Sequence, residues 1–141
     1  MSAESGRLYQ IGVARKDITP AYPVRLSGYA VRKTESIEVT QWLWTKALAI
    51  GSDKEGPALL ITVDSIGVPR HVRDEVVRRL QRKKRIAPER VAICSTHSHT
   101  TPCLGGNLET LFGEPLPPDQ LARVERYTRE LVDEIGRASC R

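Results

Sequence analysis

The side chains best suited to chemistry lie together in one short segment, CSTHSHTTPC, at positions 94–103. Histidines two positions apart on extended backbone point to the same side with Cα atoms roughly 6–7 Å apart, so His97 and His99 can converge on one metal ion or substrate. Imidazole is the commonest metal ligand, and an open zinc site uses about three protein ligands and a water molecule. The spacing alone leaves two interpretations open: a metal site, or two histidines that bond backbone carbonyl groups.

A second candidate is Asp64, which directly follows the apolar run ALLITV at residues 58–63. A carboxylate at the edge of a core strand is costly to bury unless it is paired or bound to a metal ion. The alternative is a turn or N-cap role for a helix that opens at Pro69. The pattern leaves both roles for Asp64 open.

Two cysteines, Cys94 and Cys103, bracket the histidines, so a structural zinc site with four ligands is an alternative. Their spacing is unlike the paired short loops of zinc ribbons. Cys94 lies in a predicted strand, where small thiols are commonly buried, and we therefore expect it to pack in the core. His71 is expected to be a surface residue. The chain contains no G-x-S-x-G, P-loop or G-x-G-x-x-G motif, so serine-hydrolase and nucleotide-binding functions lack support.

The composition is that of a globular domain, with 141 residues, 40% of them hydrophobic, and a net charge of +5. No window approaches the roughly 18–20 apolar residues of a spanning helix, and the opening MSAESGRLYQ lacks the features of a signal peptide. As it stands, the sequence therefore predicts a cytoplasmic protein, with secretion of a longer form left open. Three cysteines cannot form a disulfide framework, so stability must come from a packed core.

Positive charge is concentrated at residues 70–90, where nine Lys or Arg and three acidic residues give a net charge of +6. Such a stripe can hold anionic lipid or nucleic acid through phosphate contacts. The interpretation we favour is the solvated outer face of a helix. We expect only weak contact with a membrane surface and no specific binding of nucleic acid.

Hydrophobic periodicity predicts an α/β fold. Residues 9–18 are predicted to form a strand, and residues 43–50 and 58–63 an antiparallel hairpin across a polar, glycine-flanked loop. Because ALLITV is apolar at consecutive positions, we expect both faces of that strand to be covered. Residues 90–95 are predicted to be a further buried strand.

Two amphipathic helices complete the prediction. The first opens at Pro69 and carries its apolar residues on one stripe, namely Val72, Val76, Val77 and Leu80. The second spans residues 119–135, with an apolar stripe of Leu121, Val124, Tyr127, Leu131 and Val132. Strand, helix and strand in succession favour parallel pairing by a crossover, so the class is a mixed β-sheet with flanking helices.

The last eight residues, EIGRASCR, resemble the translation of a common sequencing adapter. We therefore predict that residues 1–133 form the native part and that residues 134–141 are a non-native tail. Gly136 and Ser139 are expected to break the helical pattern there. On this interpretation the natural protein continues past Asp133.

Several blocks of the chain resemble the N-terminal domain of the neutral/alkaline non-lysosomal ceramidases and their bacterial relatives. They follow the order of that family over nearly the whole chain up to Asp133. The most specific is a Thr-His-x-His followed by a small polar residue and proline. The matching blocks are IGVARKDITP (11–20), LSGYA (26–30), LWTKALAI (43–50), LLITVDSIGV (59–68) and CSTHSHTTP (94–102).

This resemblance implies a mononuclear zinc amidase that cleaves the N-acyl bond of ceramide, a lipid-like amide, to sphingosine and a fatty acid. It implies that His97 is a zinc ligand, that His99 is a catalytic residue lining the same pocket, and that Asp64 lies near the metal as a second catalytic residue. The remaining ligands of the family, a second histidine, a glutamate and a tyrosine, would lie beyond Asp133, as would its active-site serine. The chain is thus expected to be an incomplete part of a larger zinc-hydrolase domain and inactive alone.

Two other functions are alternatives to this one. A scaffold without catalysis could bind anionic lipid or nucleic acid through residues 70–90. A zinc hydrolase of the metallo-β-lactamase type is disfavoured, because Thr100, Thr101 and Pro102 follow the histidine pair where that type has Asp-His.

Overall fold

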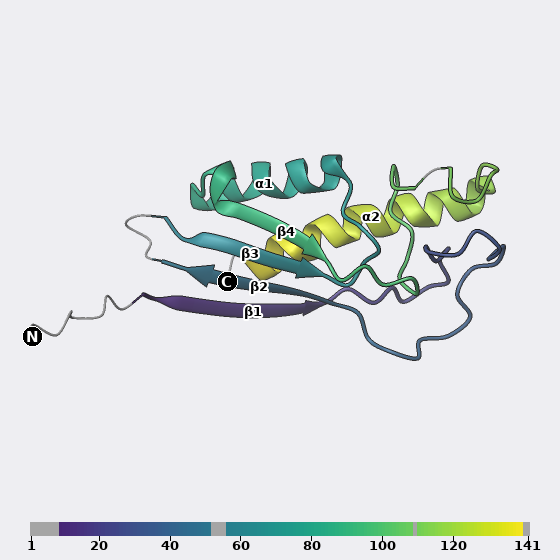
Figure 1. Ribbon diagram of the computed structural model, residues 1–141, viewed down its shortest axis with the longest axis horizontal. Helices are drawn as coiled ribbons and strands as arrows, with labels where there is room; N and C mark the ends of the chain where they lie inside the picture. The colour runs from purple at the N-terminus through teal and green to yellow at the C-terminus, as the bar shows by residue number, and fades with distance from the viewer. Residues whose placement is uncertain (1–8, 52–55, 109, 140–141) are drawn as a thin grey trace, which may run out of the picture.

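The fold is a mixed sheet with two helices on one of its faces, as the computed structural model in Figure 1 shows for residues 9–51, 56–108 and 110–139. These described residues form four strands, two α-helices and a short 3-10 helix. In chain order they are β1 (Ile11–Asp17), β2 (Trp44–Ile50), β3 (Ala58–Val63), α1 (Arg70–Lys84), η1 (Pro88–Arg90), β4 (Val91–Ser95) and α2 (Pro118–Ser139). The predicted α/β class with a mixed sheet is confirmed.

The strands lie in the order β1-β2-β3-β4. β2 pairs antiparallel with both β1 and β3, whereas β3 and β4 are parallel. The predicted hairpin and the predicted parallel pair are therefore both present. Residues paired across a sheet share a face, so Val13, Leu48 and Leu60 form one row, because Val13 pairs with Leu48 and Leu48 with Leu60.

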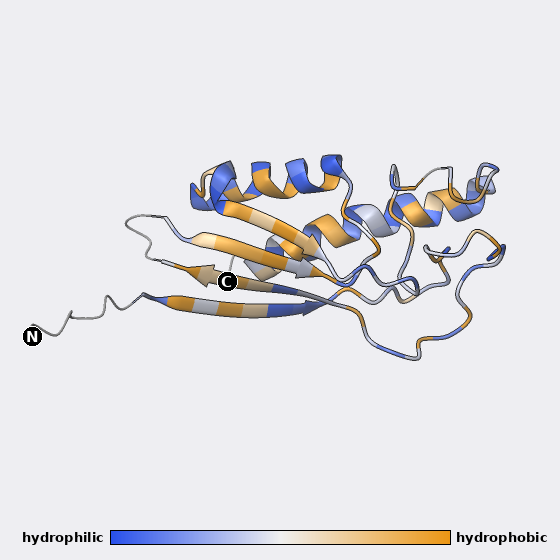
Figure 2. Ribbon diagram, viewed as in Figure 1, coloured by the Kyte–Doolittle hydropathy of each residue, from blue (hydrophilic) through white to orange (hydrophobic). Residues whose placement is uncertain are grey.

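The core lies between the sheet and the two helices. Ile61 and Val63 of β3 are fully buried there, together with Leu80 of α1 and Leu131 of α2. Figure 2 shows hydrophobic residues along the strands and on helical turns that alternate with hydrophilic ones. One face of the sheet thus supplies most of the contact that holds the helices.

The opposite face of the sheet is open in the described part of the chain. Leu60 is 42% exposed, so the expectation that residues 58–63 are covered on both faces is wrong for this structure. Cys94 is also exposed, which contradicts its predicted core position. It pairs with Thr62 and therefore lies on the open face, because side chains alternate along a strand and both helices pack on the other side.

Helix α1 forms as the periodicity predicts. Its four predicted apolar residues are all buried. Pro69, in extended conformation, precedes the first turn, where a missing N–H costs nothing, and Arg85 ends the helix in left-handed conformation by donating its N–H to Gln81. The basic side chains consequently lie outside the core, as expected for a solvated face.

Helix α2 is longer than predicted, because it continues through Gly136 to Ser139. Ile135 and Ala138 are buried, and Glu134 pairs with Lys16 of β1 at 3.4 Å. These tertiary contacts outweigh the roughly 1 kcal/mol helix penalty of a glycine. The predicted break is therefore wrong, and so is the predicted inward position of Leu121, which is exposed. The non-native origin of residues 134–141 stays a prediction, with residues 140 and 141 outside the described ranges.

None of the helices in the described ranges is both long and apolar enough to cross a membrane.

Candidate metal site at the carboxyl ends of β3 and β4

The loops that follow the parallel strands β3 and β4 run side by side. Thr96 donates its backbone N–H to the carbonyl oxygen of Val63 at 3.0 Å, and Ser98 donates to that of Ser65 at 3.3 Å. Carboxyl ends of parallel strands are the usual place for ligand sites in α/β folds. The pairing brings the segment after Asp64 and the histidine segment to one edge of the sheet.

His97 occupies a sharp turn at this edge. Its φ of 58° is left-handed, so the expectation of extended backbone across the histidine pair is wrong. Its Nδ1 lies 2.8 Å from the carbonyl oxygen of Ile66. Because a carbonyl oxygen can only accept, Nδ1 donates in this bond, which leaves the lone pair of Nε2 free for a ligand.

The ring of His99 lies beside that of His97, with 5.2 Å between centroids and 76° between the planes. The two rings thus converge as expected, although by a different backbone path. Tyr29 contacts His99 from the loop after β1, with ring centroids 5.2 Å apart and an angle of 63°. An aromatic side chain therefore joins the histidine pair to a segment about 70 residues earlier in the chain.

That earlier segment is bound closely to the histidine loop. Ser27 donates its N–H to Thr101 O at 2.9 Å, and Cys103 donates to Arg25 O at 2.8 Å. Gly28 has a φ of 100°, and a Cβ at this position would come within 2.5 Å of His99 Cβ. Only glycine fits such an approach, which explains the glycine in the LSGYA block.

A buried arginine ties these loops to the rest of the molecule. Arg25 is only 3% exposed and has no carboxylate partner among the described residues. Its Nη1 donates to Lys33 O at 2.6 Å and to Gln120 Oε1 at 2.8 Å, and its Nη2 donates to Arg32 O at 2.6 Å. Burial raises the pKa of the neighbouring Cys103 thiol, so that side chain stays protonated. Sequence reasoning missed Arg25, because no local pattern marks a buried arginine.

Asp64 is held at the other side of the edge. Its Oδ2 accepts the N–H of Trp44 at 2.8 Å, and its own N–H donates to Trp44 O at 2.9 Å, so it fastens the end of β3 to the start of β2. It does not cap α1, which begins after Pro69. No hydrogen bond of Asp64 reaches either histidine in the described structure. Its catalytic role therefore stays a prediction.

A complete metal site is not present in the described part of the chain, where no three His, Cys, Asp or Glu side chains are grouped to hold an ion. Cys103 is buried and Cys94 is exposed on the open sheet face, so this region gives no support to the four-ligand alternative. His71 is exposed as predicted. The histidine pair is what the structure brings together.

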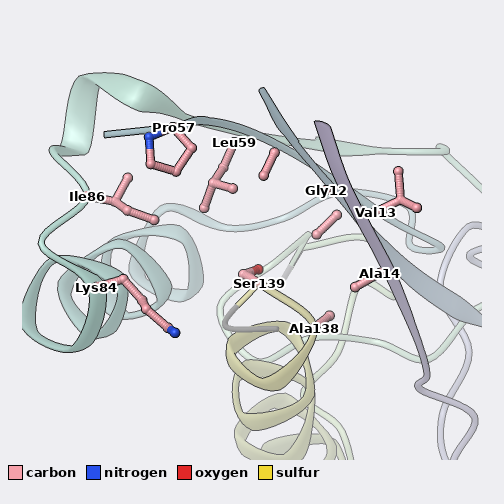
Figure 3. Close-up of a pocket in the computed structure, with 11 residues that line it drawn as sticks. Gly12, Val13, Ala14, Pro57, Leu59, Lys84, Ile86, Ala138 and Ser139 are labelled. Atoms are coloured by element: carbon pink, nitrogen blue, oxygen red, sulfur yellow. The ribbon is translucent and has the colours of Figure 1, made fainter. Parts of the chain in front are cut away.

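A cavity of about 230 Å³ opens at the far end of the sheet, between the starts of β1 and β3 and the ends of the two helices (Figure 3). Its walls are mostly small or apolar, with Lys84 and Ser139 as polar side chains. Among the described residues that line it there is no histidine, cysteine or carboxylate. His97 and His99 lie at the opposite end of the sheet, where the parallel strands β3 and β4 end.

Residues 9–114 match the family described as neutral/alkaline non-lysosomal ceramidase, N-terminal. The chain belongs to that family, so the predicted resemblance is confirmed. Comparison with curated protein sequences gives no match.

Two solved structures share the fold. A neutral ceramidase from Pseudomonas aeruginosa is 22% identical with a TM-score of 0.72, and the alignment covers 92% of this chain and 20% of that one. A ceramidase complexed with C2 is 23% identical with a TM-score of 0.72, over 94% of this chain and 20% of that one. The chain thus spans one fifth of the length of these relatives.

Proposed function

We propose that this chain forms part of a zinc-dependent amide hydrolase of the ceramidase type, whose substrate is an N-acylsphingosine or a similar lipid-like amide. The observation that supports it best is the bond between His97 Nδ1 and the Ile66 carbonyl, at 2.8 Å, with the His99 ring alongside. Zinc-bound histidines commonly donate their other ring N–H to a carbonyl or carboxylate in this way. Membership of the ceramidase family supports the same chemistry.

In this proposal His97 binds zinc through Nε2 and His99 lines the same pocket. When bound, zinc lowers the pKa of a water ligand to about 7 and polarises the amide carbonyl, which an unactivated amide requires. The Ile66 carbonyl fixes the tautomer of His97. Asp64 holds the end of β3 to the start of β2 through its hydrogen bonds with Trp44. The rings of His97 and His99 cannot supply all the protein ligands of a tetrahedral zinc site. We therefore expect this chain alone to bind zinc weakly and to hydrolyse no substrate.

The test compares His97→Ala and His99→Ala in a longer polypeptide that contains this segment and in the 141-residue chain. In the longer protein, His97→Ala should abolish N-acylsphingosine hydrolysis and lower zinc content, whereas His99→Ala should impair hydrolysis and leave more zinc bound. His71→Ala, on α1, is the matched control and should change neither. Full zinc content and full activity in His97→Ala would remove the site assignment.

A second candidate function is weak contact with an anionic surface through the end of α1. Arg70, Arg73, Arg78 and Arg79 each pair with an acidic side chain, Asp74, Glu75 or Asp133. Arg82, Lys83 and Lys84 form the last turn and have no ion pair among the described residues. Exposed charges are screened within about 8 Å at physiological ionic strength, so this contact should vanish with added salt. Vesicles with and without anionic lipid would measure it, and binding that survives high salt would contradict it.

A further inference from the structure

We propose that Arg32 is a positioning residue for the histidine loop. Its Nη1 donates to two carbonyl oxygens, that of Ser27 at 2.8 Å and that of His99 at 3.0 Å. Its guanidinium also lies over the ring of Tyr29, with Cζ 5.1 Å from the centroid. One side chain thus bridges the segment around Gly28 and the backbone of the second histidine.

These contacts form a continuous row that ends at the sheet edge. The guanidinium of Arg32 lies over the ring of Tyr29, the rings of Tyr29 and His99 meet at an angle of 63°, and the ring of His99 lies beside that of His97. The row is anchored at its far end, where His97 Nδ1 donates to the Ile66 carbonyl. A change at Arg32 is therefore transmitted to His99 through both the backbone and the ring.

The side chain and the carbonyl group of His99 are held by the members of this row. Within the described residues, its ring makes no hydrogen bond, and its carbonyl oxygen has Arg32 as its only donor. Its ring makes two aromatic contacts, with Tyr29 and with His97, and Arg32 lies over the ring of Tyr29. Gly28 limits movement toward the earlier segment, because the space between Gly28 and His99 is too small even for a Cβ atom. The hydrogen bonds of Arg32 to the carbonyl oxygens of Ser27 and His99 hold the segment around Gly28 against the histidine loop.

The charge of Arg32 is not neutralised by a carboxylate in the described structure. Arg123, by contrast, makes a two-pronged ion pair with Glu35. A guanidinium that bonds only carbonyl groups and an aromatic face acts through geometry, since its planar donors and flat face suit these partners better than an ammonium does. This points to positioning rather than to an ion pair that stabilises the surface.

The functional meaning of this role rests on the proposed zinc site, but the positioning itself is measurable without metal. We would compare Arg32→Met with Arg126→Met in the 141-residue chain. Arg126 is a matched control, because its Cζ lies 4.2 Å from the ring centroid of Tyr22, and its ion pair is with Glu130 on the same helix. The readout is the ring-proton NMR signals of His97 and His99, with the methyl signal of Ile61 reporting an intact core.

We expect Arg32→Met to shift and broaden the His99 ring signals while the Ile61 signal stays unchanged, and Arg126→Met to leave both histidines as in the wild type. Arg32→Lys keeps donors for the two carbonyls but loses the flat contact with Tyr29, so it should give an intermediate shift. His99 signals that remain those of the wild type in Arg32→Met would overturn the proposal. If Arg32→Met fails to fold, wild-type His99 signals in Arg32→Lys would overturn it instead.

A zinc titration of the longer polypeptide that contains this segment then separates this proposal from the proposed function. Loss of partners around a metal site typically costs 10- to 100-fold in affinity, so we expect about tenfold weaker zinc binding in Arg32→Met and no change in Arg126→Met. A longer wild-type polypeptide that binds no zinc, with the His99 shift still present in the 141-residue Arg32→Met chain, would refute the zinc site and leave Arg32 as a positioning residue. Zinc binding by the wild type, together with wild-type His99 signals in Arg32→Met, would support the zinc site and overturn the positioning role of Arg32.

Discussion

The two faces of the sheet are made of similar residues but have different surroundings. Ile61 is fully buried beneath the helices, while Leu60, the preceding residue of the same strand, is 42% exposed. The open face continues onto the edge strand, where Val13 is 79% exposed. Large apolar residues therefore occur on both faces, and what differs is which face the helices cover (Figures 1 and 2).

This difference shows what an uninterrupted apolar strand can and cannot reveal. A run such as ALLITV is typical of a strand covered on both faces, yet α1 and α2 both pack on one side of it. The other side keeps a contiguous apolar surface of Ile11, Val13, Leu48, Ile50 and Leu60, with Arg15 and Lys46 in the next row. Surfaces of this kind are typical of interaction sites.

The largest effect should come from paired substitutions on the two faces of β3. Ile61→Ala removes a fully buried side chain and leaves a cavity, so we expect it to lower the free energy of unfolding by about 3 kcal/mol. Leu60→Ala removes a side chain that is already partly in water and should cost about 1 kcal/mol or less. Urea denaturation of both variants measures the difference. Equal losses would mean that the open face is covered in solution.

A second substitution asks whether the end of α2 truly belongs to the covered face. Ile135 is fully buried, so Ile135→Ala should destabilise the chain by about 2–3 kcal/mol. Leu121→Ala, at the exposed start of the same helix, is the control and should cost under about 0.5 kcal/mol. Thermal unfolding of the two variants checks this. An Ile135→Ala variant as stable as the wild type would support the prediction that residues 134–141 are no part of the native fold.

A smaller effect is expected where α2 is hydrogen-bonded to the end of β1. The hydroxyl of Tyr127 donates to the Ile18 carbonyl at 2.9 Å, and burial raises the pKa of this phenol, which keeps it protonated. Tyr127→Phe leaves a buried carbonyl without its donor and should cost about 1 kcal/mol. Tyr22→Phe removes a half-buried hydroxyl that bonds Glu130, so its loss should be smaller. Denaturation midpoints that fall equally in both variants would contradict the contrast.

On the open face, Val13→Thr should change the free energy of unfolding by no more than about 0.5 kcal/mol, because threonine keeps the β-branched shape in an exposed strand. It should also lower the binding of a hydrophobic dye such as ANS, since the hydroxyl interrupts the row of Val13, Leu48 and Leu60. The matched change on the covered face, Val63→Thr, should destabilise the chain clearly. Unaltered dye fluorescence in Val13→Thr would mean that the dye does not bind at the row of Val13, Leu48 and Leu60.

The smallest effect lies on the outer surface of α1, away from both faces. Hydrogen bonds from Arg78 and Arg79 lower the pKa of Glu75 from its usual 4.5 to about 2. A lowered carboxyl pKa in the folded state stabilises the protein above the unfolded pKa, and that contribution is lost as the pH falls from about 4.5 to about 2. Because the pair is partly exposed and screened, we expect about 0.5 kcal/mol or less. Glu75→Gln should flatten this part of the stability–pH curve, and an unchanged curve would show that the pairs contribute nothing.

Much of the fold could be predicted from local pattern. Alternation and turn residues predicted the hairpin of β2 and β3, and the helical stripe of Val72, Val76, Val77 and Leu80 predicted α1. The end of α2 could not be predicted, because the contacts of Ile135 and Ala138 with the core lie outside any local window. The exposure of Cys94 was missed for a related reason: pattern shows that a strand is apolar, but not which of its faces a helix covers.

The histidine segment shows the same division. The residue types and their spacing were enough to identify His97 and His99 as candidates and to place them after a strand. Side-chain type and strand periodicity can both be determined from a short stretch of sequence. Only the tertiary structure decided that His97 adopts a left-handed conformation and that its Nδ1 donates to the Ile66 carbonyl. The same holds for the ring contact of Tyr29 with His99 and for the hydrogen bond from Arg32 to the His99 carbonyl. These contacts join segments 31 to about 70 positions apart, and such pairings arise only when the whole chain has packed.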